Sequence, residues 1–183
     1  MSHGGIDIPV IETERLILRG FAERDFAVIK SIYADPEAMR FLGGVMNEYD
    51  AWRRMAAMAG SWQLRGFGIF CVEGKAEGEC VGYCGPMRPH GWPDNEIGYT
   101  FAPAHHGKGY ATEAAAASLA FAYERLGWDT AISLIDPDNH ASQGVARKLG
   151  AVRERTGAQV TDFTADIWRH LTPAQFLARR GAA

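Results

Sequence analysis

The 183-residue sequence has few cysteines, no metal-binding spacing and no excess of positive charge. The three cysteines, Cys71, Cys80 and Cys84, form no C-x-x-C pair and leave an odd count. This favours small buried thiols in a reducing compartment over a disulfide framework. The six histidines show no H-x-x-x-H spacing. We therefore expect no metal and a cytoplasmic location.

Hydropathy and charge argue against a membrane-spanning protein and a generic nucleic-acid-binding protein. The sequence contains no run of about 18 apolar residues, so we expect no membrane span. The net charge of −3 and the isoelectric point near 6.1 give no footprint for generic nucleic-acid binding. The 47% apolar and 22% charged content is that of an ordinary globular chain. We expect a single domain over 1–183, with a flexible segment over 1–10 and a short C-terminal helix over 172–183.

Hydrophobic periodicity predicts strands and helices in a mixed order. Helices are expected from Asp25, as N-cap, to Ala34, and over 47–64, 111–126 and 139–149. Strands are expected over 15–21, 67–73, 79–85, 96–101, 130–135, 152–156 and 163–170. The order is an antiparallel meander, one strand–helix–strand unit and a closing hairpin. This predicts an α/β fold with a mixed sheet, because a doubly wound sheet needs repeated crossovers.

The most informative segment joins the strand over 96–101 to the helix that follows. It reads Pro-Ala-His-His-Gly-Lys-Gly-Tyr-Ala-Thr-Glu-Ala over 103–114. The first N–H groups of a helix have no intrahelical partner, and the helix dipole adds partial positive charge there. Gly107 and Gly109 remove side chains that would block a ligand. The loop is therefore predicted to wrap a phosphate or pyrophosphate.

Two other glycine loops do not fit this segment. A P-loop needs G-x-x-x-x-G-K followed by Ser or Thr, whereas Lys108 lies between the two glycines and Tyr110 follows the second. A dinucleotide fingerprint needs a third glycine where Thr112 stands. Asp129 has about the spacing of a ribose-binding acid, but it begins a predicted strand instead of ending one. A nicotinamide enzyme is therefore a distant alternative.

The six residues His106 to Ala111 fit the pattern Q/R-x-x-G-x-G/A, which resembles the acetyl-CoA pyrophosphate loop of the GNAT superfamily, the general-control-related N-acetyltransferases. Residues 138–151 resemble the second signature block of the ribosomal-protein N-terminal (RimJ/RimL-like) branch, in which Asn, and Ser three residues later, begin a helix. Residues 12–19 resemble the opening strand of that branch, and 96–99 its central strand. His106 stands where Gln or Arg is usual, and Ala151 where Phe is usual.

This resemblance implies the acyl-CoA N-acyltransferase fold, a mostly antiparallel central sheet that splays at the cofactor site, with flanking helices. It also implies an enzyme that moves an acetyl group from acetyl-CoA directly to a primary amine, without a metal or a cysteine nucleophile. We expect His106 to alter loop packing rather than abolish binding. The expected cofactor-binding residues are Tyr99, Phe101, His106, Gly107, Lys108, Gly109, Tyr110, Ala111, Thr112 and Asn139.

The expected catalytic residues are Glu96 and Ser142. Glu96 is the predicted base, with a strand-edge carboxylate paired to an Arg as the equal alternative and Asp94 as a weaker candidate base. Ser142 stands where the branch places a Ser near the cofactor sulfur, so it is predicted to protonate the leaving thiolate. Its alternative role is that of an ordinary helix first-turn residue. Trp92 and Tyr83 are weaker candidates for the acceptor groove.

The predicted acceptor is a protein or peptide N-terminal α-amine. Small amines of the polyamine, antibiotic or amino-acid type are the first alternative, and a non-catalytic acyl-CoA-binding sensor is the second. Trp52 and Trp62 have helical spacing, which favours the core over an acceptor site. Both a monomer and a homodimer remain open.

Overall fold

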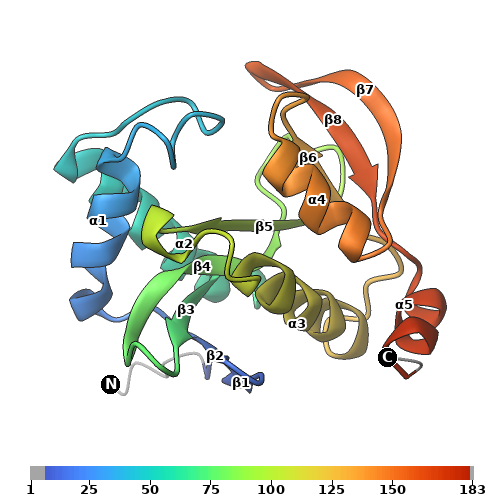
Figure 1. Cartoon of the computed structure of the whole chain (residues 1–183), viewed down its shortest axis with the longest axis horizontal. Helices are drawn as coiled ribbons and strands as arrows, with labels where there is room; N and C mark the ends of the chain where they lie inside the picture. Colours follow the sequence, from blue (N-terminus) through green and yellow to red (C-terminus); the bar gives the residue numbers. More distant parts are fainter. Residues whose placement is uncertain (1–6, 182–183) are drawn as a thin grey trace. The chain divides into compact units, whose positions relative to one another are not determined.

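The computed structural model describes residues 7–181, which form two compact units. The first unit holds the chain up to Cys84 together with Tyr99–Tyr110, and the second holds Gly85–Gly98 and the chain from Ala111 onward. Eight strands and five α-helices lie in the described residues (Figure 1). The mixed α/β class predicted from the sequence is confirmed. The expected flexible segment over 1–10 lies partly outside the described residues, as does the end of the expected terminal helix.

Four strands of the first unit are all antiparallel neighbours, in the order β1-β2-β3-β4. They are β1 (Ile11–Glu12), β2 (Leu16–Arg19), β3 (Phe70–Gly74) and β4 (Glu79–Met87), whose last three residues belong to the second unit. The hairpin expected for the last two strands is confirmed, with a register shift between Val72 and Glu73. The sequence did not predict β1, which is only two residues long.

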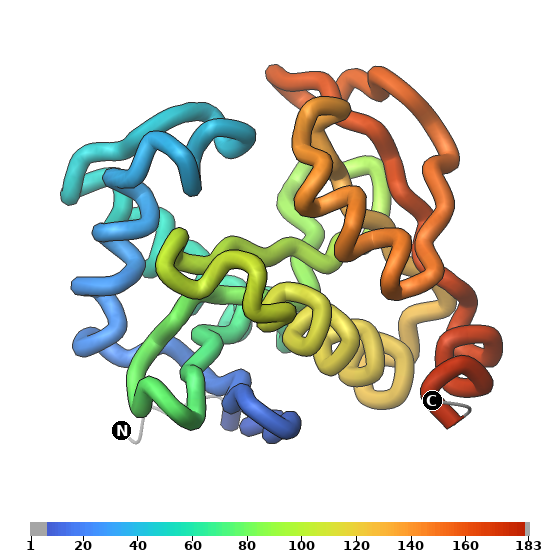
Figure 2. Tube along the Cα trace, in the orientation of Figure 1, coloured from blue at the N-terminus to red at the C-terminus, as the bar shows by residue number. Residues whose placement is uncertain are grey.

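Two helices of the first unit pack on each other. They are α1 (Phe26–Ala34), preceded by a short 3₁₀ turn over Glu23–Asp25, and α2 (Glu48–Arg65). An irregular loop joins them (Figure 2). The start of α2 is set by Asn47, whose side chain accepts a hydrogen bond from the Asp50 N–H, and its end by Gly66 at a φ of 73°.

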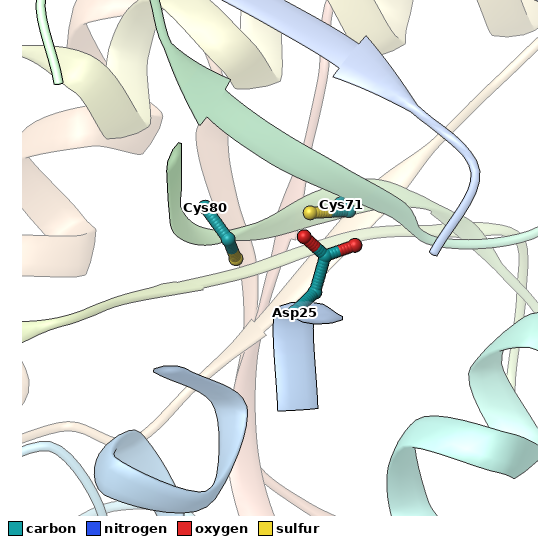
Figure 3. A group of neighbouring side chains, drawn as sticks. All are labelled: Asp25, Cys71 and Cys80. Carbon is teal, nitrogen blue, oxygen red and sulfur yellow. The ribbon is translucent and has the colours of Figure 1, made fainter. Parts of the chain in front are cut away.

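Asp25 stands at the N-cap position of α1 as expected, but its side chain makes no capping hydrogen bond, because Arg19 binds its carboxylate. Two Arg19 nitrogens donate to the two Asp25 oxygens at 2.8 Å each, and the Ala22 N–H donates to Oδ2 at 2.8 Å. Cys71 and Cys80 lie beside this carboxylate (Figure 3), and one ligand atom from each of the three side chains lies within 4.8 Å of the others. All three cysteines are buried and free. Because the carboxylate is already neutralised, we retain the prediction of no metal.

The strands of the second unit follow the order β5-β6-β8-β7, with one parallel pair, β5 to β6. Their bounds are β5 (Glu96–Phe101), whose last three residues belong to the first unit, β6 (Ile132–Ile135), β7 (Val152–Val160) and β8 (Phe163–Arg169). Figure 1 shows β7 and β8 as a long hairpin. The strand β7 is longer than expected because its exposed, polar residues carry little apolar signal.

Three further helices are α3 (Tyr110–Glu124), α4 (His140–Lys148) and α5 (Pro173–Gly181). The last begins as predicted, because Thr172 and Gln175 form a reciprocal cap: the Gln175 N–H donates to Thr172 Oγ1, and the Thr172 N–H donates to Gln175 Oε1. Across residues 7–181, every helix is too short or too polar to cross a membrane.

A buried histidine closes the core of the second unit. His170 is 5% exposed, and its Nε2 lies 3.0 Å from Ser133 Oγ, which itself donates to the Ile97 carbonyl at 3.0 Å. Nε2 therefore donates and carries the proton, while Nδ1 is buried without a partner among the described residues. Burial, together with the charge of Arg169, lowers the pKa of His170 to about 4.

This histidine makes stability depend on pH. The unfolded chain binds a proton at the ordinary pKa of 6.5 and the folded chain only near 4, so the native state loses stability as pH falls between these values. At pH 4 the loss reaches about 3 kcal/mol. In urea unfolding, the free energy of unfolding of the wild type should exceed that of His170→Asn by less at pH 4 than at pH 7, and the decrease should be of that order. The exposed His140→Asn is the matched control, and a pH-independent difference for His170→Asn would contradict this account.

Candidate active site

The glycine loop connects β5 to α3 through a short 3₁₀ turn over Pro103–His105. Gly107 has a φ of 74° and Gly109 a φ of 84°, which residues with a side chain rarely adopt. An added Cβ at Gly107 would meet no atom within 4 Å, so the loop is open on that side. The backbone therefore has the conformation and the free space that a bound phosphate requires. These observations fit a CoA pyrophosphate.

His106 holds the loop back onto the end of β5. Its Nε2 lies 2.9 Å from the Phe101 carbonyl oxygen. Whether His106 alters the packing of the loop relative to Gln or Arg stays a prediction. The same contact occupies one lone pair of the Phe101 carbonyl, which was expected to face the pantetheine arm. Tyr99, the other expected contact on β5, is half-buried.

Two side chains of the predicted loop are directed toward Glu77 in the β3–β4 turn. The buried Tyr110 hydroxyl donates to Glu77 Oε1 at 3.1 Å, and Lys108 Nζ lies 3.5 Å from the same oxygen. Burial alone would raise the pKa of Glu77, but hydrogen bonds and the neighbouring cations lower it below its usual range. The Tyr110 hydroxyl is therefore directed into the first unit, whereas the Lys108 side chain remains 46% exposed. Ala111 and Thr112, in the first turn of α3, are half-buried.

In the second unit, Asn139 and Ser142 meet at the start of α4. Asn139 Oδ1 accepts a hydrogen bond from the Ser142 N–H at 3.0 Å, so Asn139 is the N-cap of the helix. The Ser142 side chain is half-buried. The geometry accounts for the helix-start role of both residues, and the expected contacts with the pantetheine and the leaving thiolate stay predictions.

Glu96 is the buried carboxylate of the second unit, 6% exposed at the start of β5. Its Oε1 accepts from the Leu134 N–H at 3.0 Å, and its Oε2 accepts a short hydrogen bond from Trp92 Nε1. Burial raises the pKa of Glu96 against the lowering effect of these two donors. Each oxygen keeps a lone pair, so the group can still accept a proton. The alternative role expected from the sequence, a carboxylate paired to an Arg, is filled by a different residue.

That residue is Asp94, two positions before Glu96. Its Oδ2 lies 2.5 Å from Arg169 Nη1, and Arg169 also binds Glu154 and the Thr130 hydroxyl. Burial alone would raise the pKa of Asp94, but the hydrogen bond from Arg169 lowers it. A carboxylate held ionised by a guanidinium is a poor base. Of the two candidate bases, the geometry favours Glu96.

The aromatic candidates differ in their surroundings. Trp92 is half-buried, donates to Glu96 and packs 5.8 Å from the ring of Phe163. Tyr83 is buried in β4, where its hydroxyl accepts from the Tyr33 hydroxyl at 3.1 Å, and burial raises its pKa. This environment favours a core role for Tyr83 over an acceptor contact.

The two tryptophans of α2 were both expected in the core. Trp62 is 2% exposed, as expected, and donates to the Ile69 carbonyl. The expectation for Trp52 is wrong, because it is 41% exposed and packs edge-on against Phe26.

Comparison with protein families decides the class of the chain. Residues 15–152 match the model of the acetyltransferase (GNAT) domain, which is more than half of the sequence. The chain belongs to the GNAT acetyltransferases. Two proteins of Bacillus subtilis are similar to it. The uncharacterized protein YkkB is 34% identical over 79% of this chain and 86% of its own length. The uncharacterized N-acetyltransferase YnaD is 30% identical over 79% of this chain and 83% of its own length.

Solved structures agree with this assignment. An acetyltransferase from Agrobacterium tumefaciens has a TM-score of 0.82 at 29% identity and covers 93% of this chain and 99% of its own. Two more distant structures, both in complex with coenzyme A, share the fold. The ribosomal L7/L12 α-N-protein acetyltransferase RimL has a TM-score of 0.70 at 18% identity, over 88% of this chain and 96% of its own. The aminoglycoside acetyltransferase AAC(6')-Ib has a TM-score of 0.76 at 17% identity, over 90% of this chain and 99% of its own.

The loop geometry predicts that Gly109→Val abolishes CoA binding in a folded protein. The φ of 84° is strained for valine, and the added Cβ would lie 3.2 Å from Arg15 Nη2. Calorimetric titration with CoA measures the effect, and circular dichroism checks the fold. Gly60→Val on α2, where a Cβ meets nothing within 4 Å, is the matched control. Wild-type affinity in Gly109→Val would refute the placement of the pyrophosphate.

Proposed function

We propose that this acetyltransferase moves the acetyl group of acetyl-CoA to a protein or peptide N-terminal α-amine. In this proposal the amides of 107–112 bind the pyrophosphate, Tyr99 and Phe101 on β5 and Asn139 on α4 contact the pantetheine arm, and Glu96 accepts the amine proton. Bound acetyl-CoA supplies an activated thioester. The observation that most supports this acceptor class is the ion pair between Asp94 and Arg169, because it neutralises the one acid between Arg88 and Glu96.

The support for the base is the match between Glu96 and its task. A general base works best when its pKa approaches the operating pH, and burial raises that of Glu96. A peptide α-amine has a pKa of about 7.7–8, so roughly a tenth is neutral at pH 7. A lysine amine, with a pKa of about 10.4, is neutral in only one molecule in a few thousand. A carboxylate base of moderate strength therefore suits the α-amine better.

The support for the acceptor comes from the charges between Arg88 and Glu96. A polycationic amine needs a cluster of free carboxylates, and the one acid between these two residues is Asp94. Arg169 already neutralises it at 2.5 Å. The neighbouring surface is aromatic, formed by Trp92 and the 39%-exposed Phe163. An uncharged or apolar first residue of a peptide suits such a surface better than a polycation does.

The second candidate is a small-amine acetyltransferase. An aminoglycoside acetyltransferase shares the fold as well as RimL does, and at these identities the fold is all that either likeness shows. This candidate needs free carboxylates from a part of the chain other than the residues between Arg88 and Glu96.

The hydrogen bond from Trp92 predicts a change in pH dependence. It favours the ionised form of Glu96, so Trp92→Phe should raise the pKa of that carboxyl further and move the acid limb of kcat to higher pH. Glu96→Gln should lower kcat by about 10²-fold at pH 7. The loss should narrow above the pKa of the amine, which then needs no base. A pH–rate profile unchanged in Glu96→Gln would remove this residue from the mechanism.

An acceptor screen tests the substrate class. Peptides with varied first residues, spermidine and an aminoglycoside are assayed in parallel by release of the CoA thiol. We expect turnover of at least one peptide and little of the polycations, because Asp94, the one acid between Arg88 and Glu96, is paired with Arg169. Efficient acetylation of spermidine or the aminoglycoside, with none of the peptides, would overturn the proposal in favour of the second candidate.

A further inference from the structure

Two charged side chains outside the glycine loop contact it from segments that flank the strands of the first unit. Arg15 lies directly before β2, and its Nη1 donates to the Lys108 carbonyl at 2.7 Å across 93 positions of sequence. Glu77 lies in the β3–β4 turn and binds Tyr110 and Lys108. Neither residue belongs to the pattern that predicts the pyrophosphate site. We call this pair the loop clamp.

The Arg15 contact sets the direction of one loop amide. All peptide bonds of the described chain are trans, and in a trans peptide the C=O and the N–H point in opposite directions. Because Arg15 holds the Lys108 carbonyl, the Gly109 N–H of the same peptide points away from Arg15. The guanidinium also lies 5.1 Å from the centre of the Tyr110 ring, which limits its own movement.

Both members of the clamp are themselves held in place. The Arg15 carbonyl accepts from the Lys75 N–H at 2.9 Å, which ties the backbone of Arg15 to the β3–β4 turn. The turn folds the Glu77 carboxylate over Gly74, where an added Cβ would lie 2.1 Å from Glu77 Oε2. Glu77 in turn fixes the first side chain of α3, that of Tyr110, and restrains Lys108.

We infer that Arg15 and Glu77 are positioning residues that set the affinity for CoA by fixing the amides of the glycine loop. This inference rests on the proposed use of that loop for the pyrophosphate. For Glu77, the effects of charge and of loop geometry on CoA binding are opposite in sign. Removal of a negative charge near an anion site should strengthen anion binding if charge alone matters. If the carboxylate acts through loop geometry, its removal should weaken binding.

The test is calorimetric titration with CoA at one fixed ionic strength. Arg15→Met should raise Kd by about tenfold and Glu77→Ala by about fivefold, the range expected when one charge-assisted hydrogen bond is lost at a partly exposed site. Arg65→Met, at the exposed end of α2, and Glu79→Ala, two positions beyond Glu77, make the same chemical changes and should leave Kd within about twofold. Glu77→Gln keeps an oxygen for Tyr110 and should recover part of the affinity.

A readout without ligand separates geometry from charge. In the absence of CoA, hydrogen exchange of the amides over 107–111 should be faster in Arg15→Met and Glu77→Ala than in the wild type and the two controls. Thermal unfolding of each variant checks that the fold persists. If Glu77→Ala binds CoA as tightly as Glu79→Ala, the inference is wrong. If the wild type itself does not bind CoA, the proposed function fails instead.

Discussion

The direction of the peptide between Lys108 and Gly109 is the constraint on which the proposed pyrophosphate site depends. A helix N-terminus binds an anion only when the preceding amides converge on one point, and a glycine loop by itself has too much conformational freedom to ensure this. The chain restricts that freedom at the start and in the middle of the loop. His106 holds the start against the Phe101 carbonyl, and Arg15 holds the middle through the Lys108 carbonyl. Between and beside these contacts, Gly107 and Gly109 adopt positive φ angles of 74° and 84°.

The second unit contains two carboxylates, Asp94 and Glu96, that are only two positions apart but have different surroundings. Asp94 is ionised by Arg169, whereas Glu96 is buried between Trp92 and the Leu134 amide, so their pKa values shift in opposite directions. Divergent environments of this kind commonly mark which acid has a structural role and which one handles protons. In this chain, Asp94 and Arg169 stabilise the segment that carries Trp92, and Trp92 in turn orients Glu96.

Features with local causes were predictable from the sequence. The bounds of β5, the start of α4 at Asn139 and the bounds of α2 depend on a few adjacent residues, and the structure has them as expected or within one or two positions. Contacts between distant segments were not predictable. Nothing in the sequence pairs Arg15 with Lys108, and the charge of Asp25 gave no hint that Arg19 would displace its capping role. Trp52 shows the limit of periodicity, since helical spacing identifies a face without showing what covers it.

The most direct measurement is a titration of ¹⁵N-labelled protein with CoA, followed by amide NMR. The account predicts that the N–H resonances of residues 107–112 shift the most and move downfield, because these amides become donors to phosphate oxygens. It also predicts that Gly109→Val loses those shifts. Saturable binding that moves other resonances and leaves 107–112 unchanged would contradict the central claim that this loop holds the pyrophosphate.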